Sequence, residues 1–132
     1  MPKILTFPKN FLWGASTSAY QIEGHNVNDW SEWERSEVRS KKLEKEGKNL
    51  DDYVCGQAGD SYSRYEEDLA LGTNVDCGAY RMGIEWSRIE PEQGRWNIKE
   101  IEHYRKVLQA AKARNLKIVL TLWHWTKPLS LI

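Results

Sequence analysis

The hydrophobic pattern of the chain predicts three strands separated by two helices. Residues 11–24 open with bulky apolar side chains, pass through small ones and end on a polar tip, without regular alternation. Such a run is typical of a strand buried on both faces. Residues 79–86 and 116–123 are two further apolar runs of strand length, and apolar side chains recur at helical spacing between the runs. This alternating order predicts an α/β fold with a parallel sheet.

Local signals predict where the two helices begin and end. Asp60 is expected to cap the start of the first helix. We expect that helix to end near Leu71, because residues 72–78 contain two glycines, an asparagine and an aspartate. Asn97 and Glu100 form a pair that resembles a capping box at the start of the second helix. Its apolar stripe is then Ile98, Ile101, Tyr104, Leu108 and Ala111.

A long polar segment at residues 25–59 separates the first strand from the first helix. Its charge-dense part, residues 36–46, is rich in helix formers and predicts a short exposed helix or turn. Trp30 and Trp33 precede that part, and we expect them to hold the loop against the body of the protein. A place at the rim of a substrate site is the alternative, since long loops in compact enzymes are often functional.

Charge and composition exclude several classes of partner. Lys plus Arg and Asp plus Glu both number 19, so no net field attracts nucleic acid or an anionic membrane. No run approaches the roughly 18 apolar residues of a membrane span, and no signal-peptide pattern is present. Cys55 and Cys77 lack metal or CxxC spacing, and the three histidines lack ligand spacing. We therefore expect a cytoplasmic, reduced chain without a metal or other cofactor.

Polar and aromatic side chains fall at the carboxyl ends of the three predicted strands. Gln21 ends the first, Arg81 and Trp86 belong to the second, and His124 and Trp125 follow the third. Strand ends of this kind form the active-site face of a barrel. Amide and imidazole groups can both donate to and accept from sugar hydroxyls, while indole rings stack on the apolar face of a pyranose. We predict that Gln21, Arg81 and His124 face a common cavity, although each could instead be an ordinary hydrogen-bonded structural residue.

The first run resembles the N-terminal signature of glycoside hydrolase family 1, the β-glucosidase and β-galactosidase family. One position departs from that pattern, since His25 stands where a small residue is usual. Residues 80–81, 85–89 and 121–125 are similar to the second and third strands of the same family, so the resemblance covers residues 7–129. The matching positions of the signature are Phe11, Trp13, Gly14, Ser16, Ser18, Ala19, Tyr20, Gln21 and Glu23.

The resemblance implies a TIM (β/α)8 barrel that acts on small-molecule β-glycosides. By that resemblance, Gln21, His124 and Trp125 bind the glycone hydroxyls where the bond is cleaved. Arg81 would lie beneath the catalytic nucleophile and help to keep it ionised, because a nearby positive charge lowers the pKa of a carboxyl group. We interpret Glu23 and Glu85, the tempting carboxylates of this chain, as structural network residues.

The family's two catalytic carboxylates have no counterpart in this sequence. Retaining hydrolysis needs an acid/base and a nucleophile about 5–5.5 Å apart, which the family places in Asn-Glu-Pro and Glu-Asn-Gly motifs after the fourth and seventh strands. Neither motif occurs, and Ile89-Glu90-Pro91 follows the second strand and lacks the asparagine. A full barrel takes at least about 200 residues. We therefore expect residues 1–132 to be a partial barrel domain, cut after strand three and inactive alone.

Two other interpretations are compatible with the sequence. One is a non-catalytic carbohydrate-binding remnant that uses Gln21, His124 and Trp125 without chemistry. The other is an unrelated α/β protein, which three matched segments in the same order disfavour. The preferred glycone and the oligomeric state are not encoded in a recognisable way.

Overall fold

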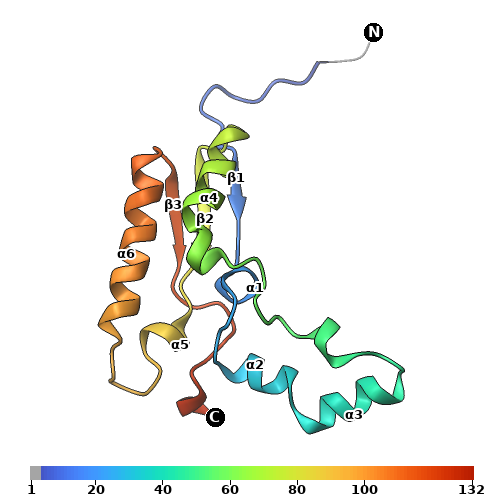
Figure 1. Cartoon of the computed structure of the whole chain (residues 1–132). Coiled ribbons are helices and arrows are strands. Elements are labelled where there is room, and N and C mark those ends of the chain that lie inside the picture. The colour runs from blue at the N-terminus through green and yellow to red at the C-terminus, as the bar shows by residue number, and fades with distance from the viewer. Residues whose placement is uncertain (1–3) are drawn as a thin grey trace.

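The computed structural model, which describes residues 4–132, contains a three-stranded parallel sheet (Figure 1). Its strands are β1 (Gly14–Ser16), β2 (Ala79–Gly83) and β3 (Lys117–Thr121), in the order β1-β2-β3. Gly14 lies opposite Ala79, and Ala79 lies opposite Lys117. The predicted parallel sheet and its strand order are therefore confirmed.

Two long helices pack on one face of this sheet, and shorter helices follow the strand ends (Figure 1). The long helices are α4 (Ser61–Asn74) and α6 (Ile98–Ala113). The others are α1 (Ala19–Glu23), α2 (Asp29–Glu34), α3 (Glu37–Lys45) and α5 (Trp86–Ile89), with 3-10 turns at Leu50–Tyr53 and Leu129–Leu131. Helix α3 is the short exposed helix that the charge-dense segment predicts. Among the described residues, no helix is long and apolar enough to cross a membrane.

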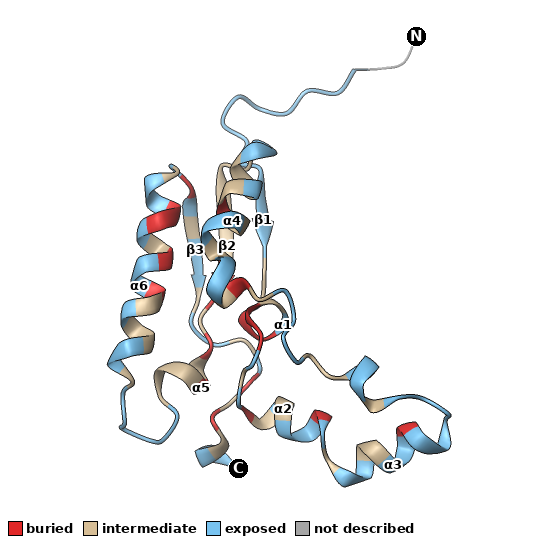
Figure 2. Ribbon diagram, viewed as in Figure 1, coloured by how far each residue is buried: buried red, intermediate tan, exposed pale blue. Residues whose placement is uncertain are grey.

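The core lies between the sheet and helices α4 and α6 (Figure 2). Tyr104, Val107, Ala110 and Ala111 form the buried stripe of α6. This agrees with the predicted stripe at Tyr104 and Ala111, but Ile98 is 63% exposed because the first turn of α6 extends beyond the core. The core has two contiguous clusters: Leu69, Ala110, Ala111 and Leu116 in one, and Met82, Tyr104 and Val107 in the other.

The strands are shorter and more exposed than the apolar runs predict. β1 has three residues, and Gln21 and Glu23 lie in helix α1 instead of at a strand end. β1 and β3 are both edge strands in the described part of the chain, and the helices cover one face only. Val119 of β3 is consequently 57% exposed. The prediction of a strand buried on both faces is therefore wrong for β1.

Helix α4 continues to Asn74, past the predicted end near Leu71. The helix ends where Asp76 adopts a left-handed conformation, with φ of 58°. There the Cys77 N–H donates to the Gly72 carbonyl and the Asp76 N–H donates to the Thr73 carbonyl. This pair of bonds satisfies the last carbonyls of the helix, so Asp76 performs the role that glycine usually has.

The predicted helix starts differ in outcome. The Asn97 side chain accepts a hydrogen bond from the Glu100 N–H, which confirms the cap of α6. Asp60 occupies the capping position of α4, but its backbone is left-handed and its side chain makes no capping bond. The predicted side-chain cap at Asp60 is therefore wrong.

Candidate active site

A cavity of about 340 Å³ lies beyond the carboxyl ends of β1 and β3. Its walls come from α1, α2, the segment at residues 53–55 and the turn at residues 124–126. The lining residues are Ser18, Tyr20, Gln21, Trp30, Glu34, Tyr53, Val54, Cys55, His124, Trp125 and Thr126.

The structure brings three of the four sequence-predicted site residues to this cavity. Gln21 is exposed on α1, and its N–H donates to the Ser18 carbonyl at 3.0 Å. His124 and Trp125 follow β3 on the opposite wall. Within the described part of the chain, the His124 Nδ1 atom is buried without a hydrogen-bond partner. The Gln21 amide and the His124 ring therefore line the same cavity, which is wide enough for a small polar ligand.

Arg81 is the fourth predicted residue, and it does not line the cavity. Its Nε atom donates to Thr121 Oγ1 at 2.9 Å, and its Nη1 atom donates to Ser16 Oγ at 3.3 Å. The guanidinium thus bridges the ends of all three strands. The prediction that Arg81 shares a cavity with Gln21 and His124 is wrong, because these strand-end hydroxyls hold its side chain on the sheet.

Two tryptophan side chains border the cavity. The rings of Trp30 and Trp125 lie 6.5 Å apart at 50°, and Trp125 is 71% exposed. Trp33 packs against Trp30 with the ring centroids 4.8 Å apart and the planes tilted by 43°, and the Arg39 guanidinium lies over the Trp33 ring. Trp30 therefore lies at the cavity, which agrees with the alternative prediction of a place at the rim of a substrate site. Trp33 does not line the cavity and packs against Trp30.

Sequence reasoning misses Tyr20, Glu34 and Cys55, which also line the cavity. Glu34 is buried and accepts a hydrogen bond from the Cys55 N–H at 2.9 Å. The Cys55 thiol contacts the Tyr20 carbonyl at 3.1 Å. Burial, reinforced by the Glu34 charge, raises the pKa values of the Cys55 thiol and the Tyr20 phenol. No periodicity marks these residues, because the irregular path of residues 25–59 brings two of them to α1.

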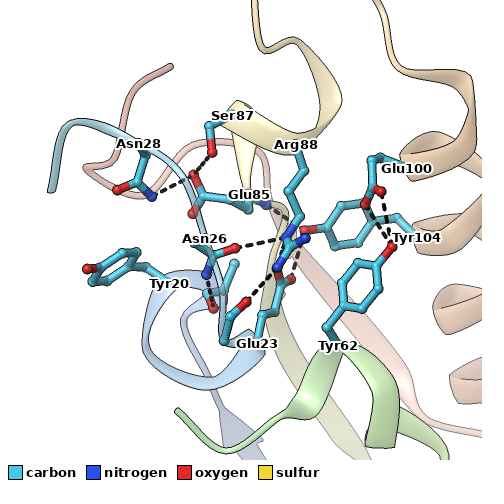
Figure 3. A network of polar contacts seen from close by, with 12 residues as sticks. Tyr20, Glu23, Asn26, Asn28, Tyr62, Glu85, Ser87, Arg88, Glu100 and Tyr104 are labelled. Atoms are coloured by element: carbon cyan, nitrogen blue, oxygen red, sulfur yellow. Dashed lines mark hydrogen bonds and ion pairs between the residues drawn. The ribbon is translucent and has the colours of Figure 1, made fainter. Parts of the chain in front are cut away.

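A buried polar network lies behind the cavity and contains the two carboxylates Glu23 and Glu85 (Figure 3). Glu85 is only 1% exposed. Its carboxylate accepts hydrogen bonds from Asn28 Nδ2 at 3.2 Å, Ser87 Oγ at 2.9 Å and Thr126 Oγ1 at 3.0 Å. Three segments of the chain, around Asn28, Glu85 and Thr126, therefore meet at one buried carboxyl group.

Glu23 is joined to Glu85 through Tyr104 (Figure 3). The Tyr104 hydroxyl donates to Glu23 at 2.8 Å and accepts from the Glu85 N–H at 3.0 Å. Arg88 donates to Glu23 at 3.0 Å and also binds Asn26 and the Gly24 carbonyl. Burial raises the pKa of Glu23 to about 7, while the Tyr104 hydrogen bond and the Arg88 charge oppose that rise. The interpretation of Glu23 and Glu85 as network residues is confirmed.

No three His, Cys, Asp or Glu side chains among residues 4–132 are arranged to hold a metal ion. The cavity is lined mainly by hydrogen-bonding and aromatic side chains, together with the Glu34 carboxyl and the Cys55 thiol. Such groups suit a polyhydroxylated ligand with an apolar face.

Parallel strand–helix units with polar loops at their carboxyl ends are the building pattern of (β/α)8-barrel enzymes. Residues 4–132 match the model of Glycosyl hydrolase family 1, so the chain belongs to that family. The family predicted from the sequence is thereby confirmed.

The relatives show which kind of protein the chain is similar to. It is 35% identical to β-glucosidase A of Acetivibrio thermocellus over 128 residues, which are 94% of this chain and 27% of that protein. It superposes on a rice β-glucosidase in a covalent complex with Glc with a TM-score of 0.80 at 33% identity, over 95% of this chain and 26% of that one. For the Thermotoga maritima β-glucosidase bound to a substituted glucoimidazole, the TM-score is 0.81 at 31% identity, over 95% and 28% of the two chains. The chain thus spans about a quarter of the length of these relatives and corresponds to one part of their fold.

Proposed function

We propose that this chain provides the sugar-binding part of a β-glycosidase site, in which a β-glycoside is hydrolysed with retention of configuration. The observation that carries the proposal is the meeting of Gln21, His124 and Trp125 at one cavity. Family membership and the sugar-bound relatives support the same ligand class.

In this proposal Gln21 and His124 bind the hydroxyls of the glycone. An amide offers both a donor and an acceptor to neighbouring hydroxyls, and the imidazole of His124 lines the same cavity with a ring that can donate or accept. Trp125 and Trp30 supply apolar surface for the ring of the sugar.

The chain's own carboxylates do not form the pair that retaining hydrolysis requires. Glu23 and Glu85 are occupied by several donors each, and neither lines the cavity. Glu34 is the only carboxylate among the lining residues of the described chain. Sugar binding without turnover is therefore the expected property of residues 1–132 alone.

A chimera tests the proposal. Residues 4–132 would replace the matching segment of β-glucosidase A from A. thermocellus, and hydrolysis of an aryl β-glucoside would be measured. We expect turnover by the chimera and none above buffer by the 132-residue chain. Gln21→Ala in the chimera should lower kcat/KM about tenfold or more, since at least one hydrogen bond to the sugar is lost.

Gln109→Ala is the matched control, because Gln109 is exposed on α6 away from the cavity. A folded chimera without activity, or one as sensitive to Gln109→Ala as to Gln21→Ala, would contradict the proposal. Binding of glucose by the 132-residue chain together with an inactive, folded chimera would favour the carbohydrate-binding remnant instead.

A further inference from the structure

Trp125 is held in an unusual backbone conformation. Its φ is 75°, and the Thr126 N–H donates to the His124 carbonyl at 3.0 Å. A hydrogen bond between residues two apart, around a central residue with this φ, defines the rare and strained form of the γ-turn. A bulky side chain in such a conformation persists only where the surrounding structure fixes it.

The fixing contacts converge on Thr126, the residue after the turn's centre. Thr126 is buried, and its Oγ1 atom lies 3.0 Å from both oxygens of Glu85. The Thr126 carbonyl accepts a hydrogen bond from Trp123 Nε1 at 3.0 Å, so the residue before the turn is also bonded to the residue that ends it. Hydrogen bonds to a buried carboxylate are among the stronger ones in proteins, so Thr126 is a firm anchor.

Glu85 also belongs to the network that reaches the opposite wall of the cavity. Its N–H donates to Tyr104, which donates to Glu23, and Glu23 lies two residues after Gln21 on α1. The two walls that carry the predicted sugar contacts are therefore connected through four buried polar groups.

We propose that Thr126 and Glu85 are positioning residues that hold the γ-turn at Trp125, and with it the Trp125 ring and His124, in the geometry that binds a sugar. The ligand class rests on the proposed function, whereas the turn itself does not. Neither residue needs to touch the ligand for this role, because each acts through the backbone of residues 124–126.

The test uses the 132-residue chain and two readouts. The first is the indole N–H resonance of Trp125, assigned with Trp125→Phe. The second is titration with a glucoimidazole. Thr126→Val removes the hydroxyl and keeps the size, so we expect the Trp125 resonance to move and the affinity to fall about tenfold. Thr126→Ser restores the hydroxyl and should restore both readouts.

Thr73→Val is the matched control, because the Thr73 hydroxyl donates to carbonyls within α4, away from the cavity. It should leave the Trp125 resonance and the affinity unchanged. Glu85→Gln is the second test variant, since it leaves a single acceptor oxygen for the three side-chain donors that Glu85 binds, and it should move the same resonance.

The outcomes separate this inference from the proposed function. If the wild-type chain binds no glucoimidazole, the proposed function fails, and the Trp125 resonance alone decides the inference. An unmoved resonance in folded Thr126→Val, or an equal change in Thr73→Val, would overturn it. Loss of the fold in both Thr126→Val and Glu85→Gln would also overturn it, because the pair would then support the whole body of the protein.

Discussion

The buried Glu23 carboxyl should make the stability of the chain fall as pH rises. Glu23 faces Tyr104, Arg88 and the nearby Glu85, and burial raises its pKa from 4.5 to about 7. In the unfolded chain the group titrates near 4.5. Between these two values the folded state binds more protons, so the stabilising contribution is complete below pH 4.5 and is lost as pH rises through 7.

The size of the effect follows from the pKa shift. One pKa unit corresponds to about 1.36 kcal/mol, so a rise from 4.5 to about 7 gives about 3 kcal/mol. We expect Glu23→Gln to remove this dependence. The free energy of unfolding of the wild type, minus that of the variant, should therefore fall by about 3 kcal/mol between pH 4 and pH 8.

Urea unfolding followed by far-UV circular dichroism at a series of pH values measures both curves. The comparison is needed because His103, whose pKa burial lowers, contributes a trend of opposite sign in an overlapping range. Glu90→Gln is the control, since hydrogen bonds from Trp86 and Gly94 lower the pKa of Glu90. The difference in the free energy of unfolding between the wild type and Glu90→Gln should change with pH only near and below pH 4.5. A wild-type minus Glu23→Gln difference that stays constant or rises between pH 5 and pH 8 would refute the reasoning.

Two further predictions concern packing and exposed surface. Leu69→Ala should lower the free energy of unfolding by about 2–5 kcal/mol, because Leu69 of α4 is buried against α6. Leu71→Ala, at an exposed position of the same helix, should change the free energy of unfolding by less than about 0.5 kcal/mol. Equal losses for the two variants in urea unfolding would contradict this prediction. The exposed edge strand β3 should make the 132-residue chain self-associate, and Val119→Lys with Leu122→Lys should shift its sedimentation toward the monomer. Val38→Lys on the exposed helix α3 should leave sedimentation unchanged, and the same shift in all variants would argue against association through β3.

Local sequence signals predict those elements whose structure depends on neighbouring residues. The Asn97 cap and the helical period of α6 involve residues three or four positions apart, and both are found in the structure. The parallel order of the strands follows from their alternation with helices. These features need no knowledge of distant contacts.

The features that the sequence does not reveal depend on contacts between distant segments. Helix α1 occupies the end of a run that lacks either period, so the pattern could not separate a strand from a short helix. Glu34 and Cys55 reach the cavity through a loop whose path no periodicity encodes. The turn at Trp125 depends on a hydrogen bond between Thr126 and Glu85, which are 41 residues apart.

The buried carboxyl groups of this chain do not serve as catalytic carboxylates, and their surroundings explain why. A general acid must be able to give its proton to a substrate, and a nucleophile must have an oxygen free to attack. Glu23 and Glu85 are enclosed by hydrogen bonds from Arg88, Tyr104 and Thr126, so their carboxyl groups connect segments of the chain, and neither lines the cavity. Gln21 and the imidazole of His124, by contrast, line the cavity. Under the proposed function, recognition of the sugar would therefore be separable from proton transfer in this part of the barrel. A site assembled this way should keep its preference for a sugar ring even where no hydrolysis follows.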